Sequence, residues 1–113
     1  MYARIAHFEA GTAEAIDRQV EAVRRDVAAA REGTSTNPST IALSGVVDRV
    51  VMLVDRENAI ATTIVFCDSQ EDLLEADRIL REMPTPGGQY GRTSVDMYEV
   101  AVDDSPRTAQ KAA

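Results

Sequence analysis

The stretch "GVVDRVVMLVDRENAIATTIVF", residues 45–66, carries the clearest structural pattern of this chain. Its two apolar runs, over 46–54 and 60–67, are rich in β-branched residues, and the polar residues "DRENA" separate them. This pattern predicts two consecutive strands joined by a turn. Both strands carry apolar side chains on both faces, whereas a strand with one face in water should alternate apolar with polar. Each face of the sheet therefore needs a cover.

The apolar residues can be assigned to the two faces by alternation, because successive side chains of a strand point to opposite sides. In the first of these strands, one face carries Val46, Val50, Met52 and Val54, and the other carries Val47, Val51 and Leu53. In the second, Ile60, Ile64 and Phe66 oppose Ala61, Val65 and Cys67.

Two other segments show helical spacing. Residues 13–32 follow a possible N-cap, Thr12, and end at Gly33. Their apolar stripe, with steps of four, three, four and three, consists of Ile16, Val20, Val23, Val27 and Ala30. A second helix follows Asp68 or Ser69, either of which could cap it. Its apolar stripe consists of Leu73, Ala76, Leu80 and Met83.

Strands over 2–9 and 93–102 complete the order βαββαβ. Turn formers over 34–40 predict a loop, and 41–45 are ambiguous between a loop and a helical turn. The order predicts one α+β domain over 1–102 with a ferredoxin-like fold, in which a four-stranded antiparallel sheet carries both helices on one face. The polar residues 103–113 are expected to form a disordered tail.

The helices leave the second sheet face without a cover. An exposed patch of that size promotes aggregation, so the simplest cover is the same face of a second copy. We therefore predict a homodimer whose two sheets pack face to face around a barrel-like interior.

The segments "YARIAHFE", "VVMLVDRENAIATTIVFCDSQEDLLEAD" and "TSVDMYEVAV", in this order, resemble the dimeric α/β-barrel superfamily, and within it the antibiotic biosynthesis monooxygenase-like branch. The resemblance implies a monooxygenase that acts on an aromatic or phenolic small molecule without metal or flavin. Haem-degrading members of the branch rely on an Asn, a Trp and a His, and this chain has no Trp. The alternative, from another class, is a non-catalytic dimer that binds a small molecule or serves a structural or interaction role.

Composition narrows the possible partners. The net charge of −7 repels nucleic acid and anionic lipid, so neither is expected as a partner. The opening "MYARIAHFEA" lacks the apolar core of a signal peptide, and a single cysteine fits a reducing compartment. We therefore expect a cytoplasmic protein. One histidine and one cysteine cannot supply a standard zinc site, so no metal is expected.

His7, the only histidine, lies on the same face of the first strand as Ala3 and Ile5. It could accept a proton from an acidic phenol, or it could be a packed residue without a chemical role. Cys67 precedes a helix N-terminus, which would stabilise a thiolate, but a free cysteine is commonly a small buried residue.

Arg4 lies on the opposite face of the first strand, where the neighbouring fourth strand would place Asp96 or Tyr98 beside it. In a ligand site, Arg4 would hold an anionic or carbonyl oxygen and Tyr98 would donate a hydrogen bond. Alternatively, Arg4 and Asp96 would neutralise each other at the dimer seam. The loop "PTPGGQYGR", 84–92, lacks the Lys-Ser/Thr of a phosphate-binding loop and is expected to be a connection or a flap over a pocket.

Overall fold

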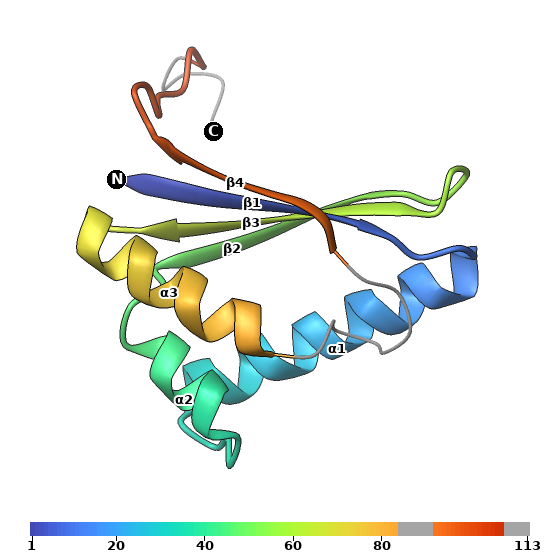
Figure 1. Ribbon diagram of the computed structural model, residues 1–113, viewed down its shortest axis with the longest axis horizontal. Coiled ribbons are helices and arrows are strands. Elements are labelled where there is room, and N and C mark those ends of the chain that lie inside the picture. Colours follow the sequence, from blue (N-terminus) through green and yellow to red (C-terminus); the bar gives the residue numbers. More distant parts are fainter. Residues whose placement is uncertain (84–91, 108–113) are drawn as a thin grey trace.

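The computed structural model describes residues 1–83 and 92–107. Its elements are, in chain order, β1 (Tyr2–Glu9), α1 (Ala13–Glu32), α2 (Pro38–Ser44), β2 (Arg49–Asp55), β3 (Ile60–Cys67), α3 (Gln70–Glu82) and β4 (Arg92–Glu99). The strands form one antiparallel sheet in the order β2-β3-β1-β4. All helices of the described residues lie on one side of this sheet (Figure 1). The predicted α+β, ferredoxin-like fold is confirmed.

The predicted bounds of α1 are confirmed, and local chemistry explains them. The Thr12 side chain accepts a hydrogen bond from the backbone N–H of Ala15, and Gly33 ends the helix with φ 71°, a left-handed conformation that glycine adopts without strain. Of the two possible caps for α3, Ser69 is the one used, because its hydroxyl accepts from the N–H of Asp72 at 3.1 Å.

The segment before β2 differs from the prediction. A helix, α2, begins at Pro38 inside the predicted loop, and the Asn37 side chain caps it by accepting from the next two free backbone N–H groups. Val46 and Val47 then donate their N–H groups to the carbonyl of Leu43, so they extend the last turn of α2. For this reason β2 starts at residue 49 and not at 46.

The predicted grouping of Val47 on one face with Val51 and Leu53 is wrong for the same reason. Val47 precedes the strand and packs, with Val46 and Val50, against a helix-side cluster of Val65, Cys67, Leu73 and Ala76. The other face assignments of β2 and β3 are confirmed by the register, which pairs Val51 with Ile64 and Val50 with Val65.

The core divides into two clusters at opposite ends of the sheet. One is the cluster around Val65 and Cys67 just described. The other lies under the first half of α1 and consists of Ala6, Phe8, Ala10, Ala15, Ile16, Ala59 and Ala61. Figure 1 shows the reason, since α1 starts close to the sheet and then diverges from it toward α2. Ile16 is therefore fully buried, whereas Val23 and Val27 of the same stripe are only half-buried.

The opposite, helix-free face of the sheet carries the predicted apolar side chains of β2 and β3, together with the polar or charged residues His7, Arg49 and Asp96. One row across it reads Asp96, Ile5, Ile64 and Val51. Leu53 and Tyr98 on this face are 54% and 56% exposed. No helix of residues 1–83 or 92–107 covers it (Figure 1).

Residues 100–107 carry no helix or strand, so β4 ends earlier than predicted, at Glu99. Most of the loop 84–92 and the last six residues of the tail, 108–113, lie outside the described residues, and the predictions made for them stay predictions. None of the described helices combines the length and the hydropathy that a bilayer span requires.

Candidate functional site

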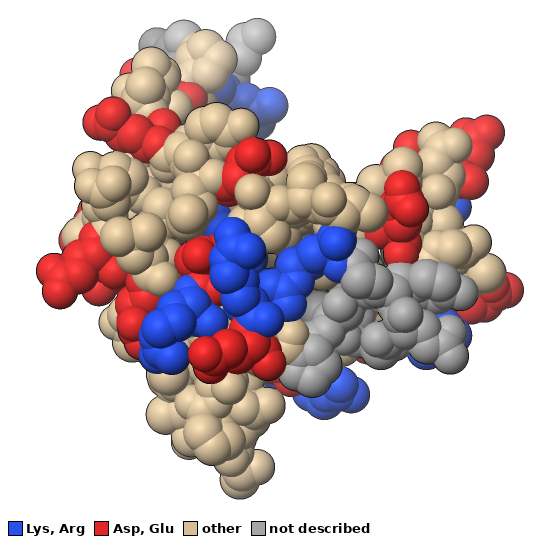
Figure 2. All heavy atoms as spheres, viewed as in Figure 1, with Lys and Arg blue, Asp and Glu red and all other residues tan. Residues whose placement is uncertain are grey.

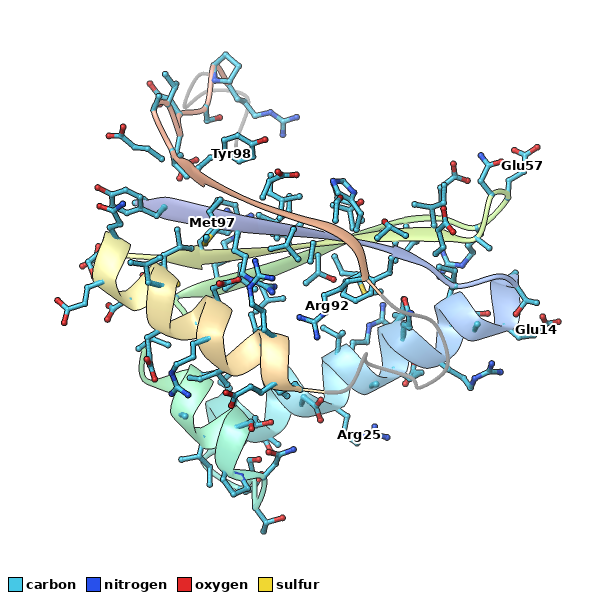
Figure 3. The ribbon with its side chains drawn as sticks, in the orientation of Figure 1. Glu14, Arg25, Glu57, Arg92, Met97 and Tyr98 are labelled. Atoms are coloured by element: carbon cyan, nitrogen blue, oxygen red, sulfur yellow. The ribbon has the colours of Figure 1, made fainter. Side chains whose placement is uncertain are left out.

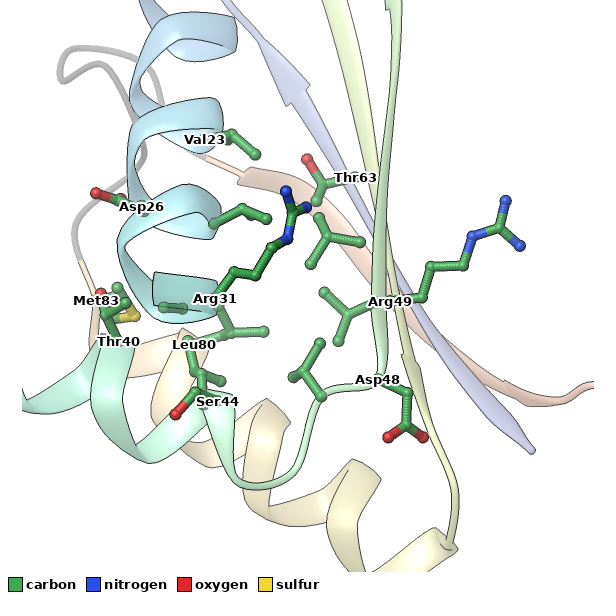
Figure 4. Close-up of a pocket in the computed structure, with 16 residues that line it drawn as sticks. Val23, Asp26, Arg31, Thr40, Ser44, Asp48, Arg49, Thr63, Leu80 and Met83 are labelled. Atoms are coloured by element: carbon green, nitrogen blue, oxygen red, sulfur yellow. The ribbon is translucent and has the colours of Figure 1, made fainter. Parts of the chain in front are cut away.

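A hollow of about 470 Å³ opens where α1 diverges from the sheet (Figure 4). We call it the α1 pocket. It lies between the second half of α1, α2, the end of α3 and strands β2 and β3. Its volume is within the range of small-molecule sites, roughly 300–1,000 Å³. Most of its wall is aliphatic, including Val23, Val27, Leu43, Val50, Val65 and Leu80.

A second hollow continues from the α1 pocket along α1, toward Met52 and Val54 of β2. The two share Val23, Val27, Arg31 and Val50. The second hollow is bounded by α1 and by residues 50–56 of the edge strand β2 and the turn after it.

Several polar side chains lie on the wall of the α1 pocket and contrast with its aliphatic surface. The hydroxyl of one of them, Ser44, donates to the carbonyl oxygen of Ile41 at 2.6 Å, which leaves Thr40, Thr63 and Arg31 besides the charged residues described below. Thr40 of α2 is buried and Thr63 of β3 is half-buried. Arg31, in the last turn of α1, extends its side chain across the pocket toward Thr63 (Figure 4). Within residues 1–83 and 92–107, Arg31 forms no ion pair. The pocket thus offers one cation and two hydroxyl groups to a ligand.

The other charged residues along the α1 pocket do not point into it. Asp26, Asp48 and Arg49 all project away from the hollow in Figure 4. The guanidinium of Arg49 lies on the helix-free side, 5.6 Å from the centroid of the Phe66 ring. Arg31 therefore dominates the electrostatics of the pocket.

The predicted neighbours of Arg4 are wrong. Arg4 lies on the opposite face of β1 from His7, as predicted, but this is the helix side and not a dimer seam, and its Nε donates to Asp77 of α3 at 2.9 Å. Across the β1–β4 pair, Arg4 stands opposite Met97, while Asp96 and Tyr98 stand opposite Ile5 and Ala3 and thus face the other side of the sheet. A strand meets its neighbour through the backbone, whereas its side chains reach the layer above, and here α3 supplies the carboxylate. Neither the predicted Arg4–Asp96 pair nor an Arg4–Tyr98 site forms.

His7, Asp96 and Tyr98 share the helix-free face. His7 is opposite Thr62 of β3, and its Nδ1 lies 2.9 Å from the hydroxyl oxygen of Thr62. On its other side it is opposite Ser94. None of these side chains lines the α1 pocket. The sheet therefore separates the predicted base from the hollow that the structure shows.

Cys67 is fully buried in the cluster under α3. Burial raises the pKa of its thiol to about 11, and the negative charges of Asp48 and Asp72 add to this effect. The thiol form therefore prevails at neutral pH, which favours the interpretation of Cys67 as a packed core residue over that of a nucleophile.

The α1 pocket was not among the sequence predictions. Its residues look like ordinary core positions in sequence, and only the angle between α1 and the sheet leaves them unpacked. Comparisons with protein-family models, with curated proteins and with solved structures found no match for this chain.

Proposed function

We propose that this protein binds a small apolar molecule in the α1 pocket, and that an anionic or carbonyl group of this ligand meets Arg31. The observation that carries the proposal is an aliphatic hollow of about 470 Å³ into which a single cation points. Apolar ligand surface gains free energy by leaving water, and a few polar groups in such a site fix the ligand's orientation.

Arg31 should contribute measurably to affinity, because its guanidinium has no carboxylate partner in the described part of the chain. A hydrogen bond to a charged group contributes about 1.5–3 kcal/mol, which corresponds to roughly 10- to 150-fold in affinity. The two threonine hydroxyls can add neutral hydrogen bonds.

The pocket can be tested with anilinonaphthalene sulfonate, a probe with an apolar ring system and one anionic group. Ala30→Phe places a ring in the hollow and is expected to abolish saturable binding. Ala42→Phe makes the same change at an exposed position of α2 that does not line the pocket, and should leave binding intact. Equal binding by both variants would refute the proposal.

The charge requirement needs a separate pair of variants. Arg31→Gln should weaken probe binding about 10-fold or more. Arg25→Gln removes the same charge from an exposed position of α1 that points away from the molecule, and should change affinity little (Figure 3). Native mass spectrometry of the protein purified from its own cell would then identify a retained ligand.

We also propose that a second copy of the chain covers the helix-free face. Support comes from the exposed Leu53, Ile60 and Tyr98 on a face without helices. An obligate interface buries roughly 2,000 Å² or more in total. Leu53→Asp should therefore produce monomers in analytical ultracentrifugation. Leu74→Asp is the matched control, since Leu74 is 53% exposed against 54% for Leu53 but lies on α3. A wild-type monomer at micromolar concentration would exclude this dimer.

A second candidate function is the cofactor-independent monooxygenase implied by the resemblance to the antibiotic biosynthesis monooxygenase-like branch. The observation that favours it is that His7, Asp96 and Tyr98 lie on the face that a dimer would enclose. In that space His7 would deprotonate a phenol and Tyr98 would donate to the resulting anion. Oxygen uptake with electron-rich phenols should then depend on His7 and persist in Ala30→Phe, whose change is on the other side of the sheet. Uptake that survives His7→Gln would remove this candidate.

A further inference from the structure

Two arginines, Arg4 and Arg81, contact the Asp77 carboxylate between α3 and the sheet, and a third, Arg92, contacts the backbone just after α3. Arg4 and Arg81 each bring Nε to within 2.9 Å of an Asp77 carboxylate oxygen. Arg92, at the start of β4, reaches back toward the helices (Figure 3) and donates from Nη2 to the carbonyl oxygen of Met83 at 2.9 Å. We call Arg4, Asp77, Arg81 and Arg92 the arginine cluster.

The arginine cluster carries excess positive charge. Three guanidinium groups and one carboxylate sum to +2, in a chain whose formal net charge is −7. In Figure 2, basic side chains gather near the centre of the face that shows the end of α3 and the start of β4. Acidic side chains also adjoin the basic ones in this area.

The nearest other charges along α3 are already paired with each other. Arg78 contacts both Glu75 and Glu82. Neither glutamate forms an ion pair with the arginine cluster among the described residues. Arg78, Glu75 and Glu82 together carry a net charge of −1, so they offset the +2 of the arginine cluster only in part, and without an ion pair to it.

Arg4 supplies an independent sign that an acceptor is missing. Its side chain is 3% exposed, and its Nη2 is buried without a hydrogen-bond partner in the described residues. A buried donor of this kind normally has a protein, water or ion partner. The surroundings of Arg92 agree, since burial and then the charges of Arg4 and Arg81 lower its pKa. An anion beside these arginines would give Nη2 of Arg4 an acceptor and would reduce the repulsion between Arg92 and the charges of Arg4 and Arg81.

We propose that the arginine cluster binds a phosphate group, either free or carried by a small molecule. A phosphate with nearly two negative charges matches the +2 of the cluster, and guanidinium groups bind phosphate oxygens through paired N–H donors. Nη2 of Arg4 then gains an acceptor. The α1 pocket includes none of the four cluster residues, although Met83, whose carbonyl oxygen Arg92 contacts, lies on its wall.

The test is isothermal titration calorimetry, in which inorganic phosphate is added to the full chain at constant ionic strength. Wild type should bind saturably, and Arg81→Gln should weaken binding about tenfold or more, as expected for a lost charge-assisted hydrogen bond. Arg78→Gln is the matched control, because Arg78 and Arg81 are on the same helix and are 58% and 55% exposed. If both variants lose affinity equally, or if wild type does not saturate, the proposal is wrong.

A second measurement locates the phosphate without relying on a variant. In ¹⁵N NMR spectra, the Nε–H signals of Arg4 and Arg92 should shift with phosphate along the same saturation curve, while that of Arg78 stays in place. Unshifted Arg4 and Arg92 signals at saturation would overturn the assignment. A glycerol phosphate that binds more tightly than inorganic phosphate would assign the site to a small-molecule ligand, and equal affinity would assign it to free phosphate.

Discussion

The ion pair between Arg4 and Asp77 gives the sharpest test of how the core is held together. Both side chains lie between β1 and α3, 3% and 14% exposed, with 2.9 Å between Nε and Oδ1. We consider three variants, Arg4→Met, Asp77→Leu and the double variant that combines them. Each single change leaves a buried charge without its main partner, whereas the double change removes both charges.

The structure ranks the three losses in free energy of unfolding. Breaking a buried pair costs about 3–5 kcal/mol. Asp77→Leu should lie at the upper end, because it leaves Arg4 next to Arg81 and Arg92 with no carboxylate between them. Arg4→Met should cost less, about 3 kcal/mol, because Arg81 continues to pair with Asp77. The double variant should lose no more than about 2 kcal/mol, since well-packed apolar replacements of buried pairs are often nearly neutral.

Urea denaturation of the four proteins at one pH and one protein concentration measures these values. A fixed concentration matters because any self-association stabilises the folded state by mass action. The expected result is a double variant more stable than Asp77→Leu alone. If instead the double variant loses the sum of the two single losses, Arg4 and Asp77 act independently and the reasoning fails.

Three further predictions concern the Cys67 thiol, the ionisation of Asp77 and the caps of α1 and α3. The rise of the Cys67 pKa from 9.0 to about 11 leaves roughly 100-fold less thiolate at neutral pH than in a thiol of pKa 9.0. Because the side chain is also shielded from solvent, iodoacetamide should label native Cys67 at least about 100-fold more slowly than free cysteine, and an equal rate would contradict the burial. Burial alone would raise the pKa of Asp77, but hydrogen bonds from two arginines hold this pKa below its usual 3.8. The ionised carboxylate therefore stabilises the fold fully above about pH 4, and this stabilisation is lost as the pH falls through the lower pKa of the folded state. Thermal unfolding should show this acid loss in wild type and a smaller one in Asp77→Asn. Thr12→Ala and Ser69→Ala each remove a helix N-cap and should each lower the free energy of unfolding by about 1 kcal/mol. Urea unfolding followed by circular dichroism measures this free energy, and values equal to wild type would contradict the prediction.

The elements that repeat a period over many residues could be predicted from sequence alone. α1 and β3 were placed with correct bounds because a twenty-residue helical stripe and an eight-residue β-branched run outweigh local ambiguity. α2 is too short for periodicity to detect. Its signal was the pair Asn37-Pro38, a capping side chain followed by the residue best suited to a first helical position.

The site could not be predicted in the same way, because it depends on distances between layers. The partner of Arg4 was sought on the adjacent strand, but a side chain on the helix face meets whatever the helix above presents, which here is Asp77. Likewise, Val23 and Val27 have the spacing of core residues. Whether they pack or line a hollow depends on the angle of α1, which no residue pattern specifies.

The divergence of α1 from the sheet has a consequence for its backbone dynamics. Amide protons around Ile16 are covered by close-packed neighbours, so they should exchange with solvent deuterium only through large-scale opening. Those around Val27 border a hollow, and small local fluctuations should be enough to release them. An occupant beneath the helix would slow exchange in its second half alone. A single continuous helix would thus report on occupancy at one end and on global stability at the other.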